Sequence, residues 1–384
     1  MMGKEMRILH INCNYMGTRL HQTMIEHLDS YVLENKVFCP IYNGSDIVTK
    51  PNSNVIVSNC FSWSDRAFYF RKQRKIIQSV EEKIKVNDYN CIHAYTLFTD
   101  GNVAYQLSKK YSIPYVVAIR STDVEFFKYR PYLKSRGIEI MKNASAVFFL
   151  ADTMRQHIIS QYLSSKDAQE VLSKSYVIPN GIDDFWFENK YRERTNYNVE
   201  KQIKERVIKI ICVAQIIKRK NIPMLQEAIL LLKNQGWDVS LKVIGKPVNQ
   251  KEYKKIIADP NTEFIRPVPK EKLIDYYRQA DIFVLPSKRE TFGLVYAEAM
   301  SQGLPVVYSR GEGFDEQFEE GEVGFSVSNT NKKELAEKII LCVTNYRKLS
   351  EKAVEYVDKF NWNSICEKYR DIYDDIIRRG NVNE

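Results

Sequence analysis

The sequence lacks the patterns that mark several large classes of protein. Its seven cysteines are an odd number and form no C-x-x-C pair, which argues against a disulfide framework and against a zinc site. No apolar run approaches the roughly 20 residues that cross a membrane, and the opening MMGKEMRILHI lacks the long apolar core of a signal peptide. Low-complexity segments are absent as well. We therefore expect a globular protein of the cytoplasm.

Length and composition favour two domains. A single hydrophobic core seldom grows beyond roughly 250 to 300 residues, so a chain of 384 residues is expected to divide. The chain has the composition of an ordinary globular protein, because 44% of its residues are hydrophobic and 27% are charged. That is apolar material enough for two cores.

Positive charge is concentrated in the first half of the sequence. The net charge is +9, and residues 1–180 contain 23 Lys and Arg against 16 Asp and Glu. A basic half can meet an acidic lipid, a phosphate-bearing acceptor or nucleic acid. Solubility alone is the other explanation of this excess.

One stretch, residues 281–309, has the pattern of strand, loop, helix and strand. The apolar run 281–286 is typical of a buried strand, and the polar residues 287–293 indicate a loop. A helical pattern follows and ends at Gly303, with Pro305 beyond it to prevent continuation. A second apolar run comes next. This order predicts a βαβ unit in a parallel sheet.

Two carboxylates give this unit its chemical interest. Glu290 lies in the loop where the carboxyl edge of the sheet meets the helix, and Glu298 follows about one turn into the helix, so both can reach one ligand. Backbone N–H groups at a helix start favour an anion; here they belong to Thr291, Phe292, Gly293 and Leu294. Phosphate together with hydroxyl groups is the natural ligand. Alternatively, Glu290 complements the helix dipole and Glu298 is a solvated helix residue.

The same stretch resembles the E-x7-E segment of the family 4 retaining glycosyltransferases (glycosyl transferases group 1). So long a match in order and spacing is far more specific than a short pattern. The matching residues are Pro286, Ser287, Glu290, Phe292, Gly293, Leu294, Glu298, Ala299, Met300, Gly303, Pro305, Val306 and Val307.

The resemblance implies an α/β protein of the GT-B fold, with two Rossmann-like domains whose parallel sheets face across a cleft. The segment VIPNGID at 177–183 is similar to the family's connection between domains, and its Pro179 and Asn180-Gly181 favour a turn. The domains are therefore expected at 1–180 for the acceptor and 181–360 for the nucleotide sugar. A C-terminal helix at 361–384 is expected to pack back on the first domain.

For the donor half, the resemblance implies that an Arg and a Lys after one strand contact the pyrophosphate. Lys220 matches the Lys, but Gln215 stands at the Arg position, and Lys218 or Arg219 is a substitute for the missing cation. Gly245 closes another strand at its carboxyl edge. Val268 lies in a segment that resembles the one whose backbone meets the nucleotide base.

For the acceptor half, the resemblance places Gly17 and Thr18 in the loop after the first strand, where the family usually has Gly-Gly. His93 and Asp123 match family positions, but Arg120 stands where many members have a His near the transferred sugar. Arg120 can bind an anionic acceptor or donor phosphate as a bidentate cation. An ion pair with Asp123 that shapes the end of the strand is the equal alternative.

Residues 61–86 mix aromatic and basic side chains. A basic helix with aromatics can lie at a membrane interface. The slightly favoured alternative is a helix whose aromatics pack inward and whose charges are solvated. No zinc-finger or RNA-recognition signature accompanies the stretch, so nucleic acid is not an expected partner. The aromatics are Phe61, Trp63, Phe68, Tyr69 and Phe70, and the cations are Arg66, Arg71, Lys72, Arg74 and Lys75.

The resemblance favours a retaining glycosyltransferase of the hexosyltransferase type, which moves a sugar from a nucleoside-diphosphate sugar to an acceptor hydroxyl in polysaccharide or glycolipid synthesis. Glu290, Lys220 and Arg120 are its candidate catalytic residues. The acceptor is a sugar or a lipid-linked sugar, and an anionic membrane surface is a further partner, which would hold the protein peripherally at the inner face of the membrane. No D-x-D pair stands at a strand end, so no cofactor and no essential metal are expected. The alternatives are a nucleotide-sugar epimerase of the same fold and a non-catalytic nucleotide-sugar-binding protein.

Overall fold

The computed structural model describes residues 6–42, 44–45, 51–191 and 199–382. Contacts between Cα atoms divide the chain into two compact units. The first unit contains the chain up to Leu150, Met154–Gly181 and the segment from Trp362 onward, and the second contains Ala151–Thr153 and Ile182–Asn361. The sequence-based boundary at residue 180 and this boundary at residue 181 are adjacent in the chain.

The first unit is built on a sheet with the strand order β3-β2-β1-β4-β5-β6-β7, and every described pairing in it is parallel. Strand β5 is buried at all five positions, as expected where helices cover both faces of a parallel sheet. The strands are β1 (Arg7–Ile11), β2 (Glu34–Tyr42), β3 (Val55–Phe61), β4 (Cys91–Ala94), β5 (Tyr115–Ile119), β6 (Ala146–Phe149) and β7 (Ser175–Val177).

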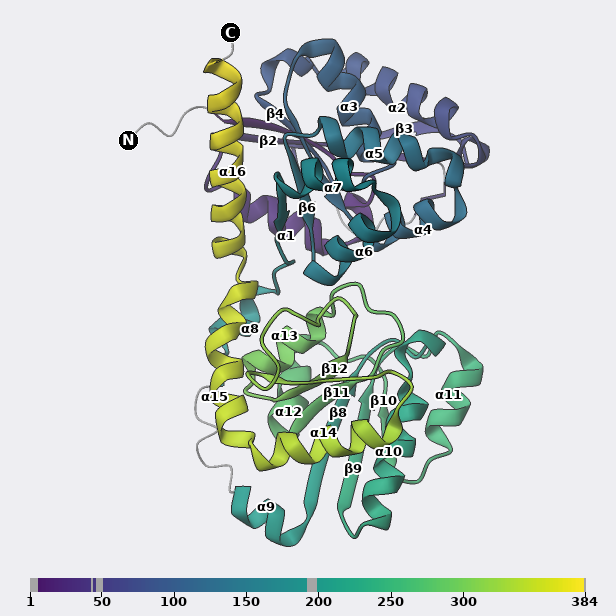
Figure 1. Cartoon of the computed structure of the whole chain (residues 1–384), viewed down its shortest axis with the longest axis vertical. Helices are drawn as coiled ribbons and strands as arrows, with labels where there is room; N and C mark the ends of the chain where they lie inside the picture. The colour runs from purple at the N-terminus through teal and green to yellow at the C-terminus, as the bar shows by residue number, and fades with distance from the viewer. Residues whose placement is uncertain (1–5, 43, 46–50, 192–198, 383–384) are drawn as a thin grey trace. The chain divides into compact units, whose positions relative to one another are not determined.

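Two hydrophobic cores lie on opposite faces of this sheet. Neighbouring residues of β2 show the alternation: Phe38 belongs to a core with α2, α3 and α5, while Val37 and Cys39 belong to a core with α1 and α16. Figure 1 shows the two groups of helices on either side of the sheet. The helices of the unit are η1 (Tyr15–Gly17), α1 (Arg19–Leu28), η2 (Ser64–Ala67), α2 (Tyr69–Lys83), η3 (Val86–Asp88), α3 (Asp100–Tyr111), α4 (Ser121–Tyr129), η4 (Pro131–Leu133), α5 (Lys134–Asn143), α6 (Asp152–Tyr162), α7 (Ser165–Leu172) and α16 (Trp362–Val382).

Helix α16 belongs to the first unit although it follows the second unit in sequence. Its Trp362 is buried against Gly181, where an added Cβ would lie 2.5 Å from the indole ring. Asn363 Oδ1 lies 2.9 Å from His27 Nδ1 of α1. Ile365, Tyr369 and other apolar residues of α16 belong to the core on the α1 face. The helix is therefore part of that core rather than an appendage.

The second unit is a sheet with the order β10-β9-β8-β11-β12-β13, again with parallel pairings throughout the described part. The order reverses between β8 and β11, which are neighbours in the sheet. A reversal of this kind opens a site at the carboxyl edge of an α/β sheet. The strands are β8 (Val207–Val213), β9 (Asp238–Ile244), β10 (Thr262–Ile265), β11 (Ile282–Leu285), β12 (Val306–Ser309) and β13 (Gly324–Val327).

Helices of the second unit connect these strands as parallel pairing requires. They are α8 (Asp184–Glu188), α9 (Val199–Glu205), η6 (Lys218–Lys220), α10 (Ile222–Asn234), α11 (Gln250–Ile257), α12 (Lys270–Gln279), α13 (Leu294–Ser301), α14 (Lys332–Thr344), α15 (Tyr346–Tyr356) and η7 (Val357–Phe360). None of the helices in the described chain has the length and apolarity that a membrane crossing requires.

The strand–loop–helix–strand prediction for 281–309 is confirmed by β11, α13 and β12.

Candidate functional site

The candidate site lies where β8 and β11 end at the carboxyl edge of the second sheet. Lys220 closes the short helix η6 after β8, and Glu290 lies in the loop between β11 and α13. The Lys220 ammonium and Glu290 Oε2 form a hydrogen-bonded ion pair, with only 11% and 8% of the two side chains exposed. Ser287 Oγ, which is buried, donates to the same carboxylate oxygen at 3.3 Å. The two predicted catalytic groups of this unit are therefore held together.

Hydrogen bonds between the two loops hold this pair in place. The Lys288 N–H donates to Arg219 O at 2.7 Å, and the Arg219 guanidinium donates to Arg289 O at 3.1 Å. The Asn221 amide donates to Pro286 O at 3.1 Å, so it joins the start of α10 to the end of β11. Asn221 adopts a left-handed φ of 57°. Its side chain thus bridges the loops and does not cap α10.

A third segment supports the loop from behind. Glu312 Oε2 accepts the Glu290 N–H at 2.6 Å, and the Gly313 N–H donates to Glu290 O at 3.0 Å. Any side chain at residue 313 would clash, because an added Cβ would lie 2.0 Å from Thr291 O. Burial raises the pKa of Glu312 to about 6. No role was predicted for Glu312, although its position between Gly311 and Gly313 was a usable signal of a turn.

The amides at the start of α13 are only partly available to a ligand. The Thr291 N–H donates to Glu290 Oε1 at 3.2 Å, so the expectation of four open amides is wrong at this residue. Within the described residues, no hydrogen bond engages the N–H groups of 292–294. Gly293 has φ of 80°, a left-handed conformation that favours glycine. Three amides without a hydrogen bond among the described residues therefore follow Glu290 at a helix start.

Glu298 lies in the second turn of α13 and accepts a hydrogen bond from Tyr277 Oη at 3.3 Å. Burial raises its pKa to about 7, with Asp183 acting in the same direction and the Tyr277 hydroxyl opposing them. Glu290 and Glu298 have different hydrogen-bond partners, so separate groups hold each of them in place. A group that changes protonation near neutral pH, close to a candidate binding loop, is typical of functional sites.

The remaining donor-side residues line the same edge of the sheet. Gln215 is exposed after β8, and the Gly245 N–H donates to Ile265 O at 3.0 Å after β9. Val268 is half-buried in the loop between β10 and α12. Of the two substitute cations, Arg219 is turned onto a carbonyl, while Lys218 lines a neighbouring pocket of about 400 Å³ together with Asn221 and Lys288.

In the first unit, Arg120 follows β5 and precedes α4. Its Nε donates to Tyr95 O at 3.2 Å, while Asp123 accepts the backbone N–H of Arg120 at 2.8 Å. Asp123 is thus a buried helix cap, and the described contacts contain no ion pair between its carboxylate and the Arg120 guanidinium. Burial raises the pKa of Asp123 to about 6. Gly17 is exposed, and Thr18 Oγ1 caps α1 by accepting from the Leu20 N–H at 3.2 Å. The loop after β1 therefore stands at the same edge of the sheet as Arg120.

His93 lies inside the core of the first unit. It has no solvent exposure, its ring stacks on Tyr95 with centroids 4.4 Å apart, and Nδ1 lies 2.5 Å from Tyr373 Oη of α16. Burial lowers its pKa well below the usual range, and His10, Arg120 and His21 add to that effect. The acceptor-binding role expected for His93 does not suit this placement, since α16 covers the ring.

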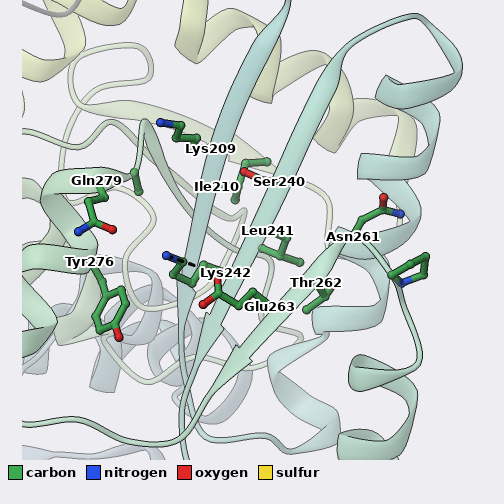
Figure 2. A pocket seen from close by; sticks show the side chains of 12 residues that line it. Lys209, Ile210, Ser240, Leu241, Lys242, Asn261, Thr262, Glu263, Tyr276 and Gln279 are labelled. Carbon is green, nitrogen blue, oxygen red and sulfur yellow. Dashed lines mark ion pairs between the residues drawn. The ribbon is translucent and has the colours of Figure 1, made fainter.

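A pocket of about 500 Å³ lies elsewhere on the second unit (Figure 2). It opens over β8, β9 and β10 beside α12, and Lys242 spans it between Glu263 and the Tyr276 ring. None of the predicted site residues lines it. In the part of the chain that the structure describes, no three His, Cys, Asp or Glu side chains gather as metal ligands.

Comparison with known proteins identifies the class. Residues 193–360 match the family described as Glycosyl transferases group 1. The D-inositol 3-phosphate glycosyltransferase of Corynebacterium kroppenstedtii is 26% identical over 315 residues, which cover 76% of this chain and 68% of that protein. The capsular polysaccharide biosynthesis glycosyltransferase CapM of Staphylococcus aureus is 27% identical over 298 residues, covering 72% and 74%.

Solved structures give the same answer for the fold. Sucrose-phosphate synthase from Thermosynechococcus elongatus has a TM-score of 0.75 at 18% identity and covers 97% of this chain and 100% of that one. Anabaena HepE in complex with UDP has a TM-score of 0.71 at 18% identity, covering 95% and 99%. The protein has the GT-B fold of glycosyltransferases.

The chain is an enzyme that transfers sugars, and its residues 193–360 match the glycosyl transferases of group 1. Sugar transfer is therefore favoured over the two alternatives from the sequence, a nucleotide-sugar epimerase and a non-catalytic binding protein.

Proposed function

We propose that the enzyme transfers a sugar from a nucleoside-diphosphate sugar to an acceptor hydroxyl, with retention of the anomeric configuration. The observation that carries this proposal is the buried Lys220–Glu290 pair beside the open amides of 292–294. A cation next to a helix start suits a pyrophosphate, and the carboxyl edge is where open parallel sheets bind nucleotides. The binding of UDP and UDP-glucose by HepE, which shares the fold, supports the same ligand class.

In this proposal the protein acts mainly by preorganised electrostatics. Lys220 and the amides of 292–294 stabilise the charge that develops on the departing diphosphate. Glu290 accepts hydrogen bonds from sugar hydroxyls, and Ser287 and Glu312 hold it for that task. Glu298 accepts from the ribose. The leaving phosphate takes the acceptor proton on the same face of the sugar, so the bond to the acceptor forms where the bond to phosphate breaks.

The acceptor is proposed to be a sugar or a lipid-linked sugar at the edge of the first sheet, near Arg120 and the Gly17–Thr18 loop. The names of the relatives, which concern inositol phosphate and capsular polysaccharide, support synthesis of a cell-surface polysaccharide or glycolipid. Cytoplasmic location with peripheral attachment to the membrane belongs to the same proposal.

Two measurements test the donor and the stereochemistry. Thermal unfolding is followed with a panel of nucleoside diphosphates, because a ligand that binds the folded state raises its stability, by about 2.7 kcal/mol at a hundredfold excess over Kd. NMR of the first product formed from an α-linked nucleotide sugar then reports the new linkage. We expect stabilisation by one diphosphate and an α-linked product; a β-linked product would overturn retention.

We also propose that transfer needs no metal. The two charges of the diphosphate meet Lys220 and the helix start, which do the work that a cation does in other transferases. Transfer rates are compared with and without excess EDTA, and we expect them to agree. A loss of activity that Mg²⁺ or Mn²⁺ restores would contradict this.

A further inference from the structure

Exposed aromatic side chains gather in two segments of the first unit. Among the described residues, six aromatics have more than a third of their surface exposed, and all six belong to this unit. Five of them lie in η2 and the start of α2 or in α4 and η4. They are Trp63, Phe68, Phe70, Tyr129 and Tyr132, which are 57% to 70% exposed.

The stretch that the sequence marked as basic and aromatic is therefore divided. Phe61 and Tyr69 pack into the core, as the inward-packing alternative expected. Trp63, Phe68 and Phe70 do not, so that alternative is wrong for three of the five rings. Helix α2 begins at Tyr69, and its buried positions recur at helical spacing from there. Phe68 and Phe70 are the sequence neighbours of the buried Tyr69, and both are exposed.

The second segment is far away in sequence but adjacent in the fold. Tyr69 Oη donates to Phe98 O at 2.7 Å, and the Phe98 ring stacks on Phe126 of α4 with centroids 5.1 Å apart. The Arg130 guanidinium lies 4.8 Å from the centroid of the same Phe126 ring. Figure 1 shows α2 and α4 on the side of the first unit that faces away from α16. The two exposed segments thus meet at Phe98, which accepts the Tyr69 hydrogen bond at its backbone carbonyl and stacks its ring on Phe126.

The same two segments are strongly basic. Residues 63–74 and 128–136 together contain eight Lys or Arg and one Asp. Asp65 is buried and pairs with Arg71 and Lys75 at 2.9 and 2.7 Å, which leaves Arg74 and Lys134 without a carboxylate partner among the described ion pairs. The surface therefore carries a local excess of positive charge that its own carboxylates do not neutralise.

We infer that this aromatic–basic surface, formed by 63–74 and 128–136, binds the face of a lipid bilayer that carries anionic headgroups. Trp, Tyr and Phe side chains partition to the boundary between headgroups and acyl chains, while Lys and Arg are attracted to acidic lipid. An acidic polymer would satisfy the cations but leave the rings without an apolar medium. The surface brings together exposed aromatics from two segments, so a broad apolar layer suits it better than a narrow ligand does.

Binding itself is independent of the catalytic proposal, but its use rests on the proposed function. A transferase that acts on a lipid-linked acceptor gains from residence at the membrane, since the acceptor is confined there. No residue of this surface belongs to the donor loops of the second unit. Vesicle binding is therefore measured in the absence of nucleotide, and nucleotide binding is measured in the absence of vesicles.

The test uses the full chain and vesicles of phosphatidylcholine, either alone or in an equal mixture with phosphatidylglycerol. We expect sedimentation with the mixed vesicles only, weakening at about 1 M salt because the Debye length falls to about 3 Å. Trp63 reports insertion by a blue shift of its emission, since Trp186 and Trp362 are buried and the half-buried Trp237 belongs to the second unit. Trp63→Phe keeps an apolar ring and loses that shift, which assigns the signal.

Two groups of variants decide the mechanism. The triple change Trp63→Ser, Phe68→Ser and Phe70→Ser should reduce the apparent affinity for mixed vesicles at least tenfold. Lys128→Gln with Lys134→Gln should reduce it by about thirtyfold, from roughly a kilocalorie per mole for each charge. Tyr176→Ser, an exposed aromatic off the surface, and Arg378→Gln with Arg379→Gln on α16 are the matched controls and should change little.

Circular dichroism and unchanged nucleotide binding show that each variant is folded. Absence of binding to mixed vesicles at about 0.1 M salt would overturn the inference. So would equal binding by the aromatic triple variant and the unchanged chain, or capture by a soluble acidic polysaccharide that the aromatic triple variant retains, since that outcome assigns the surface to a polymer.

Discussion

The polar residues associated with the two sheets of this protein have different surroundings. At the carboxyl edge of the second sheet, Lys220 and Glu290 lie on loops beside open amides. In the first sheet, the rings of His10, His93 and Tyr95 pack against one another with no solvent exposure. Both sets sit on parallel strands of the same kind of fold. The two sets differ in what covers them, because α16 covers the histidine and tyrosine rings of the first sheet through Tyr373.

The comparison teaches that strand position alone does not make a site. His93 near the end of a parallel strand is part of the core because a helix covers it, whereas Lys220 is held by loops in an ion pair beside a helix start. Burial at the first sheet keeps the histidines neutral, since it lowers the pKa of His10 to about 4. The predictions that follow separate a binding edge from a packed one.

The largest effect is expected at the open edge. Lys220→Ala or Glu290→Ala should lower the rate of sugar transfer by about 10² to 10³-fold, because one preorganised electrostatic group is lost. Steady-state transfer with saturating acceptor measures it. Lys254→Ala, at an exposed lysine of α11 outside the candidate site, is the matched control and should have a small effect. If Lys220→Ala and Glu290→Ala both left the transfer rate unchanged, the Lys220–Glu290 pair would have no part in the mechanism.

At the closed edge we expect a loss of stability with little loss of activity. Tyr373→Phe leaves His93 Nδ1 without its partner, and an unpaired buried polar group costs about 1 to 3 kcal/mol in the free energy of unfolding. Urea unfolding measures it. Tyr111→Phe removes a half-buried hydroxyl whose partner is Glu81 and should cost less. If Tyr373→Phe slowed transfer tenfold at full stability, the histidine cluster would belong to the site.

The smallest expected effect concerns pH. Because burial raises the pKa of Glu298 to about 7, this carboxyl is increasingly protonated below that pH and accepts hydrogen bonds less well. Affinity for UDP should therefore fall as the pH drops from about 8 to 6, by less than tenfold per unit. Isothermal titration of Glu298→Gln against the unchanged chain isolates this part, since the variant does not titrate there. If UDP affinity changed with pH equally in Glu298→Gln and in the unchanged chain, this would argue against contact between Glu298 and the nucleotide.

The raised pKa of Glu298 also makes the stability of the protein depend on pH. The folded-state pKa of Glu298 lies above its ordinary value of 4.5, so the folded state holds a proton that the unfolded state has released. The free energy of unfolding should accordingly fall as the pH rises from about 4.5 to 7. Glu298→Gln should flatten this slope.

The sequence predicted the parts of the molecule that depend on local pattern. The β11–α13–β12 unit was predictable because its apolar run, its loop and its glycine stop lie within thirty residues. The pairing of Lys220 with Glu290 also follows once both are placed after neighbouring strands. The tasks of Glu312 and Asn221 were missed, since they depend on how three loops meet.

What the sequence did not predict depends on distant partners. His93 resembles a family position, but Tyr373, 280 residues away, closes it off. Trp63 and Phe61 are two residues apart in one aromatic stretch, yet one is exposed and the other is core. Only the start of α2 at Tyr69 decides which rings point inward, and helix starts are the least certain feature of a pattern.

The packing of Trp362 on Gly181 also defines how the chain is threaded. Ile182 N–H donates to Phe360 O at 3.0 Å, so the chain enters and leaves the second unit at one point. Apart from Ala151–Thr153, the second unit is therefore an insertion in the sequence of the first, which resumes at Trp362. A bulkier residue at 181 would displace the Trp362 ring, because an added Cβ would lie 2.5 Å from it.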